Sequence, residues 1–258
     1  MTAACLSLSF DGAVAHLKLC RGEKLNALDA DMVEALLAIC RQIDRSDARV
    51  AILTGEGKAF CAGGDIAAWS GLSPDDFGRR WLRDGHQAFD ALTRLRPPLI
   101  AVLNGACLGG GLELAACADL RIAEAHVKLA LPETGLGIIP GWSGTQRASR
   151  RFGAQLVRRM ALMGEVFTAD QALMLGLVDQ VVPSGQGIDA ALVVAHRVAA
   201  RSPRATEVVK QLINAAEGED RERTLEMLAG ALVAGSDDLA EGLTAYREKR
   251  QPRFGGME

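Results

Sequence analysis

The segment "NGACLGGGLELAACADLRIA", residues 104–123, decides how the chain is interpreted. It is almost wholly apolar, yet it contains three consecutive glycines, Gly109 to Gly111, and one carboxylate, Glu113. Glycine weakens helices, and burying an unpaired carboxylate is costly. A membrane span of about 20 residues explains the segment poorly, because a charge near its middle is expensive in lipid. We therefore interpret it as a strand, a turn and a buried helix.

The helix in this segment is expected to begin at the glycines, directly after the strand "LIAVLN". A helix N-terminus carries unpaired N–H groups, and glycine lets a ligand approach them closely. Glu113 lies three residues beyond Gly110, and helical side chains lean toward the N-terminus, so its carboxylate would face that ligand. Amide donors for an oxyanion beside an acid or base form a catalytic arrangement. Alternatively, Glu113 only complements the helix dipole and the glycines allow close packing.

Two further segments combine glycines with polar groups. "LPETGLGIIPGWSGTQR" (131–147) presents Glu133 in a glycine-rich, mostly apolar loop, where a solvated surface charge is not expected. "AFCAGGDI" (59–66) offers the backbone N–H groups of Gly63 and Gly64 after a strand. "GACLGGGLE" lacks the GKS or GKT ending of a phosphate-binding loop. "GWSGT" is one residue short of a nucleophile elbow, so Ser143 is expected to be a helix N-cap.

Outward from these segments the chain alternates strands with helices. "ACLSLSF" and "AVAHLKL" flank Asp11–Gly12, which is a hairpin signal. Residues 30–44 have one apolar helical face, with Asp29 or Asp31 as N-cap. An amphipathic helix is expected from about residue 74 to residue 95. This alternation predicts an α/β layered core over roughly the first 180 residues.

The C-terminal part is expected to be helical. From about residue 188 to residue 250 the pattern predicts three helices, broken near Ser202–Pro203 and Gly235–Ser236. No repeat, low-complexity tract or linker separates it from the rest, so one functional unit is predicted.

Composition excludes several classes of protein. The 258 residues are 49% hydrophobic and 24% charged, as in ordinary globular proteins, and the net charge of −3 gives no global basic field for nucleic acid. The six cysteines form no CxxC pair and have no metal-type spacing with the four histidines, so we expect free thiols in a reducing compartment. The N-terminus has no signal-peptide pattern, and a cytoplasmic protein is expected.

Together the segments resemble the crotonase superfamily, the enoyl-CoA hydratase/isomerase family. The resemblance runs through "EKLNAL", "AFCAGGDI", residues 104–123, "LPETGLGIIPGWSGTQR" and "GLVDQVVP" to "YREKRQPRF". It implies an α/β fold, a spiral of ββα units, with the active site in residues 1–190. Residues 191–258 would be a helical region that assembles trimers or hexamers. It also implies a CoA thioester substrate, no metal and no redox cofactor.

The resemblance also assigns roles to individual residues. The oxyanion-hole N–H groups would belong to Gly64 and Gly110, and the two family glutamates match Glu113 and Glu133. Contacts to CoA or substrate would come from the following residues: Lys24, Ala62, Gly64, Asp65, Ile66, Ala67 and Gly110. Lys249 and Phe254 in the C-terminal tail are nominated for contact with a neighbouring CoA. Trp69 either lines the acyl pocket or packs as core.

The leading functional hypothesis is an enoyl-CoA hydratase, which adds water reversibly to a 2-enoyl-CoA as in fatty-acid β-oxidation. Family members dedicated to double-bond isomerisation generally keep the carboxylate at position 133 and lack the one at 113, so isomerase is the alternative. The next alternatives are another crotonase-type acyl-CoA lyase or hydrolase and, after these, a non-catalytic protein that binds acyl-CoA or RNA. Crowding two carboxylates in an apolar pocket should raise at least one pKa.

Overall fold

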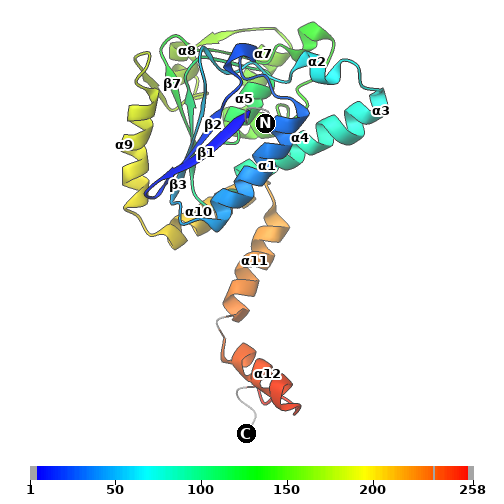
Figure 1. The fold of residues 1–258 in the computed structure, drawn as a ribbon, viewed down its shortest axis with the longest axis vertical. Coiled ribbons are helices and arrows are strands. Elements are labelled where there is room, and N and C mark those ends of the chain that lie inside the picture. The colour runs from blue at the N-terminus through cyan, green and yellow to red at the C-terminus, as the bar shows by residue number, and fades with distance from the viewer. Residues whose placement is uncertain (1–4, 235, 255–258) are drawn as a thin grey trace. The chain divides into compact units, whose positions relative to one another are not determined.

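The computed structural model describes residues 5–234 and 236–254, and two β-sheets form its centre. The larger sheet has the strand order β1-β2-β3-β5-β7-β10 (Figure 1). Only β1 and β2 pair antiparallel in it. The bounds of its strands are β1 Leu6–Asp11, β2 Val14–Leu19, β3 Val50–Gly55, β5 Leu99–Leu103, β7 Leu120–Glu124 and β10 Gln180–Val182.

The smaller sheet has the order β4-β6-β8-β9, and its first three strands are parallel. Its strands are β4 Ala59–Cys61, β6 Ala106–Leu108, β8 Lys128–Ala130 and β9 Phe167–Thr168. Along the chain, a strand of the larger sheet is followed by a strand of the smaller sheet and then by a helix. This order occurs three times, with the strand pairs β3 and β4, β5 and β6, and β7 and β8. This confirms the predicted spiral of ββα units. Because β4, β6 and β8 are parallel neighbours, the segments that follow them emerge at one edge of the smaller sheet.

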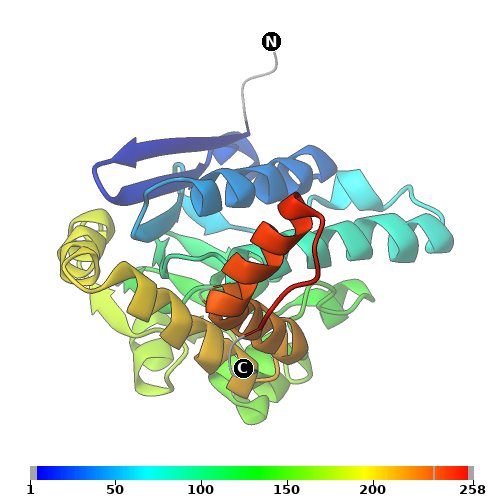
Figure 2. The same ribbon diagram turned by 90° about the horizontal axis from the view of Figure 1, so that it is seen from below.

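The first unit begins with the predicted hairpin, in which β1 pairs with β2 from Leu6↔Leu19 to Asp11↔Val14. Helix α1 (Ala30–Arg45) follows, and Asp29 is its N-cap because its carboxylate accepts a hydrogen bond from the Met32 N–H. Figure 2 shows the hairpin lying beside α1. Both predictions from the sequence are therefore confirmed.

Helices cover both faces of the larger sheet. Alternate residues of β3 point to opposite sides: Ala51 and Leu53 join the main core with α1 and α4 (Arg83–Thr93), whereas Val50 and Ile52 pack beneath α9 (Gly187–Ala199). Figure 1 shows α9 along this second face. The other short helical elements are η1 Gly22–Lys24, α2 Ile66–Trp69, α3 Pro74–Asp76, the π-helix η2 Phe77–Leu82, α5 Gly110–Ala115, η3 Glu133–Leu136, α6 Arg147–Phe152, α7 Ala154–Ala161 and α8 Ala169–Met174.

The C-terminal part contains α9 and three further helices, α10 Pro203–Ala216, α11 Arg221–Ala234 and α12 Asp237–Glu248. The prediction of three helices after residue 188 was wrong, because a third break separates α10 from α11. Gly218 there has φ +80°, a conformation that ends helices and that glycine adopts without a Cβ penalty. The alanines and charged residues that flank it are common in helices, so the sequence pattern did not indicate this break. Residue 235 of the predicted Gly235–Ser236 break lies outside the described residues.

The chain forms two compact units, residues 1–207 and 208–258. The division predicted after residue 190 falls inside α9, which belongs to the first unit. That the C-terminal helices assemble trimers or hexamers stays a prediction. In the part of the chain that the structure describes, no helix is both long and apolar enough to cross a membrane.

Candidate active site

Three segments that the sequence singled out meet where strands of the smaller sheet end. Gly63–Gly64 follow β4, Gly109–Gly110 follow β6, and Glu133 follows β8. Because these strands are parallel neighbours, the three segments line one cavity, which Glu113 also lines. Ligand sites are common beyond the carboxyl ends of parallel strands.

The backbone amides of Gly64 and Gly110 lie close together at this cavity. A methyl group on Gly110 would lie 3.4 Å from the Gly64 nitrogen, and one on Gly63 would lie 3.4 Å from the Gly110 nitrogen. Within the described residues neither amide donates a hydrogen bond. Gly110 is the first residue of α5, whose leading N–H groups have no partner inside the helix. Two amides without a hydrogen-bond partner among the described residues therefore lie near each other at the cavity.

The Gly64 loop is fixed by the segment before α1. The Leu28 N–H donates to the Gly63 carbonyl at 2.8 Å, and the Asp65 N–H donates to the Leu28 carbonyl at 2.7 Å. These two hydrogen bonds use the carbonyl of Gly63 and the amide of Asp65, on either side of Gly64, and leave the Gly64 amide without a partner among the described residues. The Arg21 guanidinium lies 2.8 Å from the Asp65 carboxylate, so an ion pair holds the loop from its other side.

At each of the three consecutive glycines, a side chain is excluded for a different structural reason. Gly109 has φ +54°, and a Cβ there would lie 2.8 Å from the Oε1 atom of Glu133. A Cβ on Gly110 would meet the Trp142 ring at 3.2 Å, beside the Gly64 amide. A Cβ on Gly111 would collide with the Cys61 carbonyl of β4. Placement of the Glu133 carboxylate, space beside the Gly64 amide and close packing against β4 therefore each require a glycine in this turn.

Glu113 is buried on α5, and its carboxylate is oriented by a loop that is distant in sequence. Its Oε1 atom accepts hydrogen bonds from the backbone N–H groups of Trp142 at 2.7 Å and Gly144 at 2.6 Å. Its other oxygen accepts none from the described residues. Burial, with a contribution from the charge of Glu133, raises the pKa of Glu113 to about 8. Such a carboxyl can exchange a proton near neutral pH.

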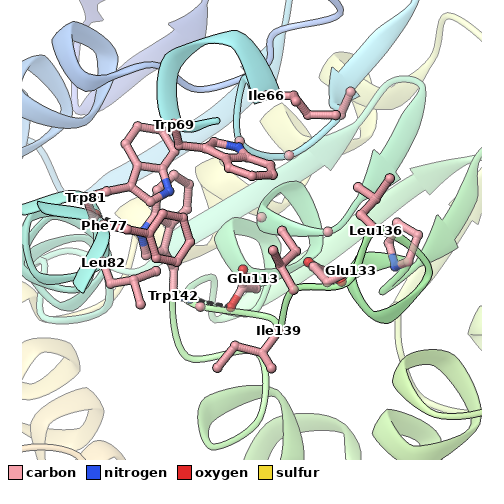
Figure 3. A pocket seen from close by; sticks show the side chains of 18 residues that line it. Ile66, Trp69, Phe77, Trp81, Leu82, Glu113, Glu133, Leu136, Ile139 and Trp142 are labelled. Atoms are coloured by element: carbon pink, nitrogen blue, oxygen red, sulfur yellow. Dashed lines mark hydrogen bonds between the residues drawn. The ribbon is translucent and has the colours of Figure 1, made fainter. Parts of the chain in front are cut away.

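Glu133 is buried as well, and it has no hydrogen-bond partner for either carboxylate oxygen among the described residues. Burial raises the pKa of its carboxyl to about 7. A buried, unpartnered carboxylate costs stability and is found where function requires it. Figure 3 shows Glu113 and Glu133 side by side at the same cavity.

The sequence model of the enoyl-CoA hydratase/isomerase family matches residues 9–257 of the chain. The chain belongs to this family. The short-chain-enoyl-CoA hydratase of Clostridium acetobutylicum is 34% identical over 248 residues, which cover 95% of each chain. The crotonyl-CoA hydratase of Syntrophomonas wolfei is 35% identical over 245 residues, 93% of this chain and 94% of that protein. The crystal structure of an enoyl-CoA hydratase from Bacillus anthracis superposes with a TM-score of 0.79 at 34% identity, over 98% of this chain and all of that one.

The residues nominated by the family resemblance divide into two groups. Ala62, Gly64, Ile66 and Gly110 line the cavity, together with the two glutamates. The remaining nominated residues of the first unit do not line it: Lys24, Asp65 and Ala67. Lys24 is exposed at the end of η1, and the Asp65 carboxylate is occupied by Arg21 and by the Ala67 N–H. Lys249 and Phe254 belong to the second unit, and their contact with CoA stays a prediction.

The loop between Pro140 and Gln146 was missed as a functional element. It supplies both amide donors to Glu113, and the Trp142 indole to the cavity wall. Ser143 is not the predicted N-cap, because Gln146 precedes α6 and the Ser143 hydroxyl lies 3.1 Å from His86 Nδ1. The one signal in the sequence is "PGWSG", where the lack of a side chain on Gly144 leaves room for the Glu113 carboxylate at the backbone amides. Trp69, for which two roles were open, has both: it lines the cavity and packs against the main core.

Proposed function

We propose that this family member hydrates 2-enoyl-CoA thioesters to 3-hydroxyacyl-CoA. The observation that carries the proposal is that both carboxylates, Glu113 and Glu133, line the cavity into which the free amides of Gly64 and Gly110 open. Hydration needs an oxyanion site, a base and an acid around one acyl group. The names of the hydratase relatives support the same activity.

The thioester oxygen accepts hydrogen bonds from the Gly64 and Gly110 amides. Glu113 takes a proton from a water molecule while the water oxygen bonds to the β-carbon, and the electron pair of the double bond shifts to the α-carbon and the thioester oxygen. Glu133 then gives its proton to the α-carbon, which completes the addition of one water. Each amide donor is typically worth about 3 kcal/mol in the transition state.

The mechanism needs one proton on the pair of glutamates. Burial raises the pKa of Glu113 to about 8 and that of Glu133 to about 7, so the pair takes up its two protons in two steps around neutral pH. The amides of Trp142 and Gly144 donate to Glu113 and stabilise its ionised form, whereas Glu133 accepts no hydrogen bond. Taken singly, these two pKa values would place the shared proton on Glu113. The two carboxyls titrate as one pair, and the direct hydrogen bonds that stabilise ionised Glu113 lead us to place the proton on Glu133.

The pH dependence of kcat/KM follows from this proton count. We expect a bell-shaped profile for crotonyl-CoA hydration with its maximum between about pH 7 and pH 8. Below pH 7 both carboxyls are protonated and the base is lost, and above pH 8 both are ionised and the acid is lost. Initial rates measured from pH 5.5 to pH 9.5 test this. A flat profile across pH 7 to 9.5 would contradict the shared proton.

The activity itself is tested with crotonyl-CoA, by following the loss of the conjugated thioester absorbance. We expect turnover that depends on enzyme concentration and yields 3-hydroxybutanoyl-CoA, identified by mass spectrometry. Migration of the double bond in a 3-enoyl-CoA without water uptake would favour an isomerase. Release of free CoA would favour a hydrolase. RNA bound in a filter titration at physiological salt, without any turnover, would indicate a non-catalytic binder.

A further inference from the structure

One wall of the cavity is unusually aromatic. Aromatic residues make up 4% of the chain, and it contains three tryptophans. All three, Trp69, Trp81 and Trp142, line this one cavity, and Phe77 joins them. The rings form two pairs: Trp69 and Phe77 meet edge to face with centroids 5.9 Å apart, and Trp81 and Trp142 are tilted with centroids 4.8 Å apart. Figure 3 shows these rings gathered on one side of the cavity.

A local departure from helical geometry brings two of these side chains to the cavity. The helix from Pro74 to Thr93 contains a π-helical stretch, Phe77–Leu82, in which hydrogen bonds join residues five apart. In an α-helix residues 77 and 82 would point in different directions. In the π-helix Phe77, Trp81 and Leu82 all reach the same cavity. Such π-helical turns frequently occur at functional sites.

The indoles lie next to the position of the reacting carbons. A methyl group on Gly64 would lie 3.0 Å from Trp81 Cζ2 and 3.4 Å from Trp69 Nε1, and one on Gly110 would lie 3.2 Å from the Trp142 ring. These two glycines carry the amides that hold the thioester oxygen in the proposed reaction. The group attached to the β-carbon of the substrate therefore meets the ring wall.

The lining of the cavity disfavours charged acyl groups. Apart from Glu113 and Glu133, every described residue that lines it is apolar or glycine. A carboxylate at the far end of an acyl chain would be desolvated there without a cation to pair with. Flat, uncharged rings gain stacking contacts against a rigid aromatic wall beyond the burial of their area.

We infer that the preferred substrates carry an uncharged aryl group on the β-carbon, as in 3-arylacryloyl-CoA and its hydrated form, 3-hydroxy-3-arylpropanoyl-CoA. The inference rests on the proposed function. In the dehydration direction the α-carbon loses a proton to one carboxylate, the hydroxyl leaves the β-carbon with a proton from the other carboxyl as water, and the double bond forms. The product is a conjugated thioester whose absorbance can be followed.

The test compares kcat/KM for dehydration of four CoA thioesters: 3-hydroxy-3-phenylpropanoyl, 3-hydroxybutanoyl, 3-hydroxyoctanoyl and 3-hydroxyadipoyl. We expect the phenyl compound to exceed the butanoyl and octanoyl compounds by about tenfold, and the adipoyl compound to be the poorest. An octanoyl or adipoyl compound that equals or exceeds the phenyl compound would overturn the inference. Failure of all four compounds and of crotonyl-CoA to react would instead remove the proposed function, and the inference with it.

Substitutions of the aromatic residues that line the cavity provide a second test of the inference. Trp69→Leu is expected to lower the ratio of kcat/KM between the phenyl and butanoyl compounds by about fivefold. Phe77→Leu is expected to lower this ratio by a similar factor, and it replaces Trp69→Leu as the test if that variant does not fold. The matched control is Phe10→Leu, since Phe10 is an exposed aromatic residue of β1 that does not line the cavity. An unchanged ratio in the folded wall variants would overturn the inference.

Discussion

Glu133→Gln is expected to lower kcat for crotonyl-CoA hydration by a factor of about 10³, within the range of general acid–base catalysis. The amide keeps the shape of the side chain but has no carboxyl proton to give to the α-carbon. Neither carboxylate oxygen of Glu133 has a hydrogen-bond partner among the described residues, so the substitution breaks no hydrogen bond seen there. Steady-state kinetics measure the loss of kcat, and calorimetric titration with acetyl-CoA is expected to show unchanged affinity.

The same variant should be more stable than the wild type at alkaline pH. The pKa of Glu133 is about 7 in the folded protein against 4.5 for an ordinary glutamate, so folding opposes ionisation of this carboxyl. The resulting destabilisation is absent below pH 4.5 and is full at pH 9, where both carboxyls are ionised. For Glu133→Gln we therefore expect a gain of about 3 kcal/mol in the free energy of unfolding at pH 9, relative to the wild type, and none at pH 4.

A matched control separates these effects from the loss of any glutamate. Glu34→Gln changes an exposed residue of α1, and both kcat and the pH dependence of unfolding should stay at their wild-type values. Chemical denaturation of all three proteins at the two pH values gives the comparison. Wild-type turnover in Glu133→Gln would refute its role as the acid, and a loss of stability at pH 9 would refute its being buried without a partner.

The glycine-rich turns could be recognised from the sequence because their requirements are local. A strand followed by "GGG" predicts a helix N-terminus with free amides, and α5 begins at Gly110 as expected. Glu113 had an alternative explanation as a partner of the helix dipole. The structure brings it to the same cavity as Glu133, 20 residues further along the chain, and this proximity is decided by the parallel pairing of β6 with β8.

Other features of the site depend on contacts between distant segments, and no local pattern reveals them. The amides of Trp142 and Gly144 reach Glu113 across about 30 residues of chain. The Trp142 ring packs against Trp81, which is 61 residues away. Apolar periodicity predicts a helix from residue 74 onward, but it does not distinguish an α-helical from a π-helical turn at Phe77–Leu82. The sequence therefore indicates the reacting groups more completely than it indicates what orients them.

Gly110→Ala is expected to lower kcat by a factor of about 10²–10³ while the protein stays folded, the loss typical of one oxyanion donor. Gly110 is the first residue of α5 and does not have a positive φ, so alanine can adopt its backbone conformation. The new methyl group would lie 3.4 Å from the Gly64 nitrogen and 3.2 Å from the Trp142 ring. It would therefore occupy the space in which the thioester oxygen must approach the Gly64 amide.

The control for this substitution is Gly71→Ala, because a Cβ on Gly71 would meet nothing within 4 Å. Both variants add one methyl group, but only the first adds it between the two amides. Thermal unfolding should show that both variants are folded at the assay temperature, and kcat with crotonyl-CoA should fall only for Gly110→Ala. If Gly110→Ala kept the wild-type kcat, the Gly64 amide would not bind the thioester oxygen. The two-donor oxyanion site would then be wrong, although both glutamates would still line the cavity.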